Sequence, residues 1–137
     1  ATFYVVWLAG YLRDENNAVR MDVLGVSLGD TGVIAMFKPV IDSTKSLVAP
    51  NQARFVEQST LVHEFGHAVG LVNNGVPLAT AHQDTAHGAH CTNTKCTMYY
   101  ANEGATDVQS WVAQNVTTGT QVLFGSECLQ DVAAIRK

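Results

Sequence analysis

The residues with the clearest chemical potential are His63, Glu64 and His67, which form an H-E-x-x-H pattern. On a helix, side chains four residues apart lie on one face, so both imidazoles can reach a single metal ion. A carboxylate beside the first histidine can take a proton from a water that the metal activates. The pattern therefore predicts a zinc-dependent hydrolytic site. A chance match within an ordinary helix is the plainer alternative.

Three further features favour the metal site over a chance match. The segment 51–70 contains no proline and reads as one helix. Gly70, three residues after His67, can adopt positive φ and end that helix. Met98 follows a histidine-rich segment. Four apolar residues of the helix repeat at spacings of 7, 3 and 4 and predict a core-facing stripe, namely Phe55, Val62, Phe65 and Val69.

This combination resembles the metzincin metalloproteases, and in particular the archaemetzincin family. The archaemetzincin pattern runs H-E-x-x-H-x-x-G-x-x-H-C-x4-C-x-M. Its first half matches His63, Glu64, His67 and Gly70. Its second half matches His90, Cys91, Cys96 and Met98, with the same spacing.

The chain departs from this pattern at the third ligand. In the family a histidine follows the glycine by three residues, but that position here is Asn73, a poor zinc ligand. A loop of about residues 72–89 stands inserted before the H-C pair. His90 is the expected third ligand because its offset to Cys96 and Met98 fits the family. Three other residues of the same loop remain candidates, namely His82, Asp84 and His87.

The resemblance assigns roles to several of these residues. Glu64 would be the general base in peptide-bond hydrolysis. Met98 would form a hydrophobic floor below the metal; a simple core methionine is the alternative. Tyr100 lies two residues further on, where a phenol in some metzincins binds the metal or stabilises the oxyanion. A packed tyrosine is the commoner fate of such a residue.

The cysteines suggest a second, structural zinc. Archaemetzincins hold one with four cysteines, and this chain retains three of them, Cys91, Cys96 and Cys128. Gly125 stands where the family has the fourth. His87 could complete a three-cysteine, one-histidine set, with His82 or Asp84 as alternatives. A disulfide with one thiol left over is the rival account.

Composition limits the remaining classes. A chain of 137 residues suits a single domain, 1–137, and we expect a monomer. The net charge of −4 gives no case for nucleic-acid binding. No apolar run approaches the roughly 20 residues that span a bilayer. A secreted or cell-envelope location is expected if a leader was removed, and a cytoplasmic one if the cysteines bind zinc.

The fold expected is α+β: a small zincin or metzincin-like domain with a twisted mixed sheet, an active-site helix and a C-terminal helix. Residues 9–21 read as a loop or short helix and 42–50 as a surface loop. We predict strands at 3–8, which should be buried, and at 23–28 and 33–38, which should pair as a hairpin. We predict helices at 51–70, 107–115 and 127–136. By resemblance, 33–38 would form the rim of the cleft, to which an extended substrate adds as a strand; an ordinary sheet strand is the alternative.

The leading hypothesis is therefore a zinc metallopeptidase that acts on a peptide or protein substrate. A non-catalytic, zinc-containing peptide-binding module derived from a metzincin is the alternative, since Asn73 and the missing fourth cysteine would suit such a history. A third hypothesis keeps only a structural zinc and treats H-E-x-x-H as coincidence.

Overall fold

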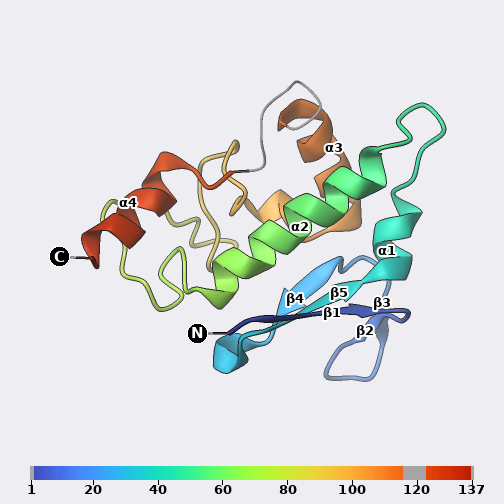
Figure 1. Cartoon of the computed structure of the whole chain (residues 1–137), viewed down its shortest axis with the longest axis horizontal. Helices are drawn as coiled ribbons and strands as arrows, with labels where there is room; N and C mark the ends of the chain where they lie inside the picture. Colours follow the sequence, from blue (N-terminus) through green and yellow to red (C-terminus); the bar gives the residue numbers. More distant parts are fainter. Residues whose placement is uncertain (1, 116–122, 137) are drawn as a thin grey trace.

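A computed structural model of the chain describes residues 2–115 and 123–136. Its main sheet has the strand order β1-β5-β4, formed by Tyr4–Leu8, Val33–Phe37 and Gly25–Ser27. β1 runs parallel to β5 and β4 runs antiparallel to it, so the sheet is mixed (Figure 1). The expected α+β class with a mixed sheet is confirmed.

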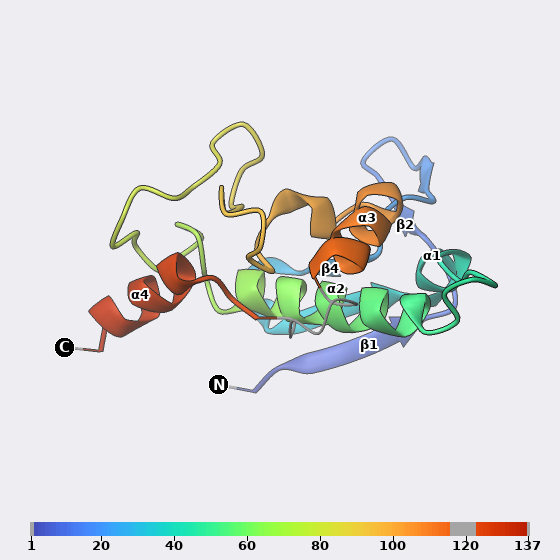
Figure 2. The ribbon, with the colours of Figure 1, turned by 90° about the horizontal axis from the view of Figure 1, so that it is seen from above.

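Two long helices complete the body of the molecule. α2 (Gln52–Ala68) lies along the sheet and contacts both β4 and β5, while α3 (Ala105–Asn115) packs against α2 (Figures 1 and 2). α4 (Ser126–Ala134) lies beyond the C-terminal end of α2 (Figure 2). All three helices agree with the sequence prediction to within two residues at each end.

The shorter elements refine two predictions. The segment 9–21 carries a small antiparallel pair, β2 (Leu12–Arg13) and β3 (Val19–Arg20), instead of a plain loop or helix. The predicted strand 33–38 stops at Phe37, because Pro39 favours the first turn of a helix and α1 (Lys38–Ser43) begins there. Two 3₁₀ turns, η1 and η2, occupy Gly29–Thr31 and Tyr100–Asn102.

The predicted hairpin is confirmed, but the position of its strands changes one expectation. β4 and β5 pair antiparallel, with Val26 opposite Ala35. β5 lies in the centre of the sheet and pairs on both sides, whereas β4 is an edge strand. The prediction that 33–38 lies at the cleft rim is therefore wrong, since a central strand has no free edge; the cleft described below is lined by β4.

β1 is also less buried than predicted. Tyr4 is 63% exposed and Trp7 47% exposed, because β1 has a neighbour on only one side. Trp7 nevertheless contacts α2, since its Nε1–H donates to Glu57 at 2.9 Å.

The buried face of α2 differs from the predicted apolar stripe. Phe65 is 38% exposed and packs edge-on against Phe3. The face that points inward carries mostly small or polar side chains: Ala53, Val56, Ser59, Thr60, His63, Glu64 and Gly66. The prediction was wrong because the H-E-x-x-H residues and their i−4 neighbours take the inward face, which leaves the phenylalanines at its margin.

The core has two parts. The larger lies between the sheet, α2 and α3, and includes Ile34, Met36, Val56, Val108 and Val112. The smaller lies under the loop after α2 and against α4, and contains Met98, Leu71, Val72 and all three cysteines.

Candidate metal centres

The H-E-x-x-H residues lie on the last two turns of α2. His63 is fully buried, Glu64 is 3% exposed, and the side chain of His67 is 13% exposed. His63 and His67 face the same side of the helix, and their Nε2 atoms lie 3.0 Å apart.

The helix ends where the sequence predicts. Gly70 has φ +85°, in the left-handed region that favours glycine. Its N–H donates to the carbonyl of His67, and the N–H of Leu71 donates to the carbonyl of Gly66, each at 3.0 Å. This pair of bonds is a Schellman ending, and it turns the chain away immediately after the second histidine.

His90 reaches the same point from the loop that follows the helix. Its Nε2 lies 3.3 Å from Nε2 of His63. The three ring nitrogens and a carboxylate oxygen of Glu103 all lie within 4.8 Å of one another. The structure thus gathers the three histidines predicted as ligands and adds a carboxylate that the sequence did not suggest. We call this group the histidine site.

Backbone carbonyls orient two of these rings. Nδ1 of His63 lies 2.8 Å from the carbonyl oxygen of Thr97, and Nδ1 of His90 pairs with the carbonyl oxygen of His87. With Nδ1–H donating to a carbonyl, Nε2 of His63 carries the free lone pair and points into the site. Nε2 of His90 also points into the site but faces the Glu103 carboxylate; burial acts to lower the pKa of His90, and its hydrogen bonds to Glu103 and to the His87 carbonyl raise it. Asn102, which is fully buried, also donates to the Thr97 carbonyl at 3.0 Å and holds it in place.

The electrostatics favour neutral imidazoles on the helix. Burial, together with the neighbouring His67, lowers the pKa of His63 to about 3. Burial, together with His90, lowers the pKa of His67 to about 4. Both rings are therefore neutral near pH 7, which is the form that binds a metal.

The two carboxyl groups differ. Burial, reinforced by the charge of Glu103, raises the pKa of Glu64 to about 7, although a backbone hydrogen bond from Ser27 opposes the shift. A pKa near the working pH is what a general base needs. Burial is the largest influence on Glu103 and acts to raise its pKa, but the hydrogen bond with His90 and the electrostatic interactions with the three histidines together lower this pKa, which favours the charged form.

These groups open onto a cleft of about 400 Å³. It is lined by the edge strand β4 with Gly29 and by Glu64 and His67 of α2. The remaining lining residues are Asn74, Ala89, His90 and Glu103. The cleft therefore joins a carboxylate, an imidazole cluster and a free sheet edge.

Met98 packs directly beneath this turn of α2. It is fully buried, and a Cβ built on Gly66 would lie 2.2 Å from its Sδ and 2.9 Å from the ring of Phe124. Only glycine at 66 lets the methionine approach the helix so closely. This place in the structure is compatible with the predicted floor and equally with a core methionine.

We expect Gly66→Ala to destabilise the protein by about 1–3 kcal/mol, because Met98 must move to admit the methyl group. The helix propensity of alanine offsets this by at most about 1 kcal/mol. Chemical denaturation measures the change. Gly10→Ala is the control, since an added Cβ there meets nothing within 4 Å. Equal stability of the two variants would contradict the packing described.

A second group of ligands lies under α4. His82, Cys91 and Cys128 place their ligand atoms within 4.8 Å of one another, and all three are buried. Sγ of Cys96 lies 3.6 Å from Sγ of Cys128. We call these four residues the thiol site. Its histidine is His82, one of the predicted alternatives, rather than His87.

The polar surroundings of the thiol site suit a cation. Hydrogen bonds from the thiols of Cys128 and Cys91 lower the pKa of Cys96, which favours the thiolate form of this sulfur. The backbone N–H of Gly125 donates to the same sulfur at 3.0 Å. Hydrogen bonding to Cys91 and to Cys96, with burial, raises the pKa of Cys128.

Asp131 of α4 completes this arrangement. It is fully buried, and its Oδ2 lies 2.7 Å from Nε2 of His82. Nδ1 of His82 faces Sγ of Cys91 at 3.4 Å. A carboxylate that holds one ring nitrogen while the other faces thiols is the usual support of a metal-bound histidine. Asp131 was not predicted from the sequence. The feature that could have indicated it is an acidic residue on the buried face of a helix that also carries a cysteine.

The loop after α2 folds back on itself and contributes side chains to both sites. Thr92 N–H donates to the His82 carbonyl at 2.8 Å, Asp84 N–H donates to the His90 carbonyl at 2.7 Å, and Gln83 forms a bridge with Cys91. In extended backbone, successive side chains point to opposite sides. His90 therefore enters the histidine site while its neighbour Cys91 enters the thiol site.

The other predicted residues lie outside both sites. The side chain of His87 is 45% exposed and its Nδ1 lies 2.7 Å from Asp84. The ring of Tyr100 stacks on that of His87, with centroids 3.8 Å apart. Asn73 donates to Gln83 at 3.2 Å. Tyr100 is not among the residues that line the cleft, so a catalytic role for it would require a change of side-chain position.

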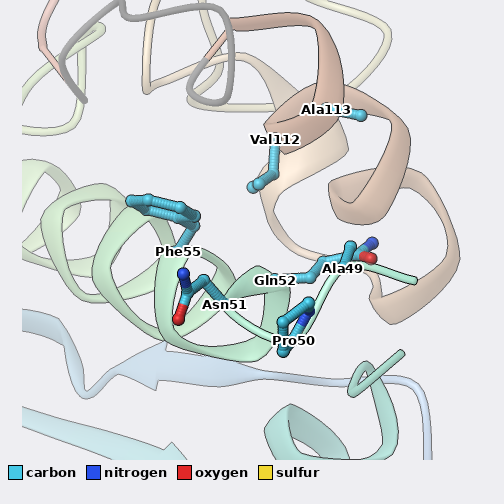
Figure 3. A pocket seen from close by; sticks show the side chains of 7 residues that line it. All are labelled: Ala49, Pro50, Asn51, Gln52, Phe55, Val112 and Ala113. Atoms are coloured by element: carbon cyan, nitrogen blue, oxygen red, sulfur yellow. The ribbon is translucent and has the colours of Figure 1, made fainter. Parts of the chain in front are cut away.

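An apolar pocket of about 360 Å³ lies between the start of α2 and α3 (Figure 3). Seven residues line it: Ala49, Pro50, Asn51, Gln52, Phe55, Val112 and Ala113. None of the seven is titratable, and Gln52 is roughly 18 Å from Glu64 along the helix at 1.5 Å per residue. Of these two cavities, the one that contains titratable side chains is therefore the cleft lined by Glu64, His67, His90 and Glu103.

Comparison with protein-family models, with curated proteins and with solved structures found no match to this chain. Within residues 2–115 and 123–136, no helix combines the length and apolar character that crossing a bilayer requires. The interpretation of both sites therefore depends on their own geometry and on the motif resemblance.

Proposed function

We propose that this chain is a zinc-dependent metallopeptidase with an archaemetzincin-like, zincin-type domain. The observation that carries the proposal is the convergence of His63, His67 and His90, of which His67 and His90 line one cleft together with Glu64. Three imidazoles with a neighbouring glutamate are the residues that catalytic zinc uses in hydrolases.

The residues fit a zinc ion in chemistry as well as in number. His63 and His67 are neutral, and His63 and His90 turn Nε2 inward because backbone carbonyls hold Nδ1. When bound there, zinc would polarise a substrate carbonyl and lower the pKa of a water molecule.

Glu64 supplies the proton-transfer group. Its carboxylate lines the cleft and its position is fixed by burial and by the backbone of Ser27. It can accept a proton from the attacking water and deliver it to the amine that leaves the peptide bond. The reaction class is therefore peptide-bond hydrolysis.

The edge strand β4 suits a peptide substrate. It pairs only with β5 within the described sheet and lines the cleft beside Glu64. An extended peptide could add to this edge by backbone hydrogen bonds, which would place a peptide bond over the histidine site.

We further propose that the thiol site binds a structural zinc through Cys91, Cys96, Cys128 and His82. A set of three cysteines and one histidine without an open position is typical of structural zinc. Such an ion would fix the loop after α2 to α4 and so hold His90 in place.

The test is hydrolysis of a mixed peptide library, read by mass spectrometry, with protein stripped of metal and then reloaded. We expect cleavage only after zinc is restored, and loss of cleavage on adding phenanthroline. The alternative is a zinc-containing peptide-binding module, which the nearness of the Glu103 carboxylate to the histidines favours. Capture of intact peptides by the reloaded protein, without cleavage, would support that alternative and contradict the peptidase.

A further inference from the structure

Among the described residues, Glu103 is the one carboxylate that groups with the three histidines. Its Oε1 lies 3.1 Å from Nε2 of His90 and 3.9 Å from Nε2 of His67. Both ion pairs of this side chain in the described part of the protein are to these imidazoles. It lies in no recognised motif, and nothing in the proposed chemistry of Glu64 requires it.

The spacing of these atoms matches the edges of one coordination shell. Tetrahedral zinc with bonds of 2.0–2.1 Å separates its ligand atoms by about 3.4 Å. The Nε2 of His63 lies 3.0 Å from that of His67 and 3.3 Å from that of His90. The contacts of Glu103 at 3.1 and 3.9 Å fall around the same value. The carboxylate therefore lies where a fourth ligand of such an ion would lie, the position that catalytic sites leave to water.

The backbone of Glu103 is anchored, but its side chain is not enclosed. Its N–H donates to the carbonyl of Tyr100 at 3.0 Å, and the next residue, Gly104, forms a β-bridge with Val23. The side chain is 54% exposed, whereas that of His90 is 5% exposed. The rings of His63 and His90 are thus held by burial and by backbone hydrogen bonds, and that of His67 by burial. The side chain of Glu103, in contrast, can swing into solvent without opening the core.

We propose that Glu103 is an exchangeable fourth ligand, which closes the histidine site at rest and gives up its position to an incoming neutral donor. The inference rests on the metal site of the proposed function. In the exchange one coordination bond breaks and another forms, and no proton or electron is transferred. A permanent fourth ligand would instead make the site structural, and a carboxylate outside the coordination shell would act only by its charge.

The test uses cobalt-loaded protein, because cobalt reports its ligands in the visible spectrum. Two quantities are measured for the wild type, Glu103→Gln and Glu103→Ala: the affinity for the metal at the histidine site, by chelator competition, and the affinity of that site for imidazole. Imidazole is neutral and binds through one atom, so removal of a negative charge alone changes its affinity little. Glu15→Gln, an exposed glutamate on the β2–β3 connection, is the matched control.

We expect opposite shifts in the two Glu103 variants. Metal affinity should fall by about tenfold or more, the scale of changes around bound zinc. Imidazole affinity should rise by a similar factor, because imidazole no longer displaces a carboxylate. Damage to the fold would weaken both, and Glu15→Gln should change neither.

Each of the following three patterns of metal and imidazole affinity would overturn the proposal. Unchanged metal and imidazole affinities would show that Glu103 is not a ligand. Weaker metal binding with unchanged imidazole binding would assign it an electrostatic effect only. A wild-type spectrum that no concentration of imidazole changes, beside variants that respond, would make Glu103 a permanent ligand. None of these readouts needs hydrolysis, so failure of the peptidase proposal and failure of this one are distinguishable.

Discussion

Glu64→Gln is expected to lower the rate of peptide hydrolysis by about 10²–10⁴-fold while zinc content and thermal stability stay at wild-type values. Glutamine keeps the shape of the side chain but cannot accept the proton. Because Glu64 is outside the group of ligand atoms at the histidine site, its replacement should not release metal. Initial rates on a cleaved peptide, measured beside zinc per chain, give both quantities.

The control for Glu64→Gln is again Glu15→Gln, which makes the same chemical change at an exposed position. It should leave the rate unchanged. Hydrolysis by Glu64→Gln at the wild-type rate, in protein that carries its full complement of zinc, would contradict the assignment of Glu64 as general base. Loss of zinc in this variant would instead move Glu64 into the coordination shell.

Cys128→Ser is expected to remove one zinc ion per chain and to lower the free energy of unfolding by several kcal/mol. Structural zinc contributes about 10–16 kcal/mol to the folding of small zinc-finger peptides, and a domain with a larger core should depend on it less. Cys128 is the ligand that α4 supplies, so its loss frees this helix from the loop that carries Cys91. Native mass spectrometry and thermal unfolding measure the two effects.

Comparison of two histidine variants makes this test more specific. His82→Ala should behave like Cys128→Ser, because His82 is buried between Cys91 and Asp131. His87→Ala should keep the second zinc, because His87 is partly exposed and contacts Asp84. The rival account is a disulfide between Cys96 and Cys128. One zinc in both wild type and Cys128→Ser, with a denatured wild-type mass two hydrogens low, would establish that account.

The local elements could largely be predicted from the sequence, because each has its own signal. Gly70 adopts the predicted left-handed conformation, and the turn around Gly29–Thr31 joins the two strands of the expected hairpin. These features depend on backbone preferences within a few residues. They need no knowledge of what packs on them.

Burial was harder to predict because it depends on which elements become neighbours. The apolar residues of 3–8 suggested an interior strand, yet β1 is at the edge of the sheet and Tyr4 is mostly exposed. On α2 the apolar spacing pointed to Phe65, whereas His63 and Gly66 take the buried face. The H-E-x-x-H residues of α2 point inward, and this arrangement, which the apolar pattern does not encode, leaves Phe65 partly exposed.

The residues of the candidate sites could be predicted only where they belong to a motif with a fixed spacing along the sequence. The offset from His90 to Met98 predicted the histidine that the structure places beside His63 and His67. Glu103 and Asp131 have no such spacing, since each is brought to its site by tertiary contacts. The choice between His82 and His87 likewise depended on how the inserted loop folds back.

The central claim is that His63, His67 and His90 hold a metal ion. The most direct measurement is zinc per chain, by elemental analysis and native mass spectrometry, in protein never exposed to chelator. We predict two ions in the wild type and one in both His63→Ala and His67→Ala; the second variant serves in case loss of the buried His63 prevents folding. A wild type without zinc, or folded histidine variants that keep two ions, would contradict the claim.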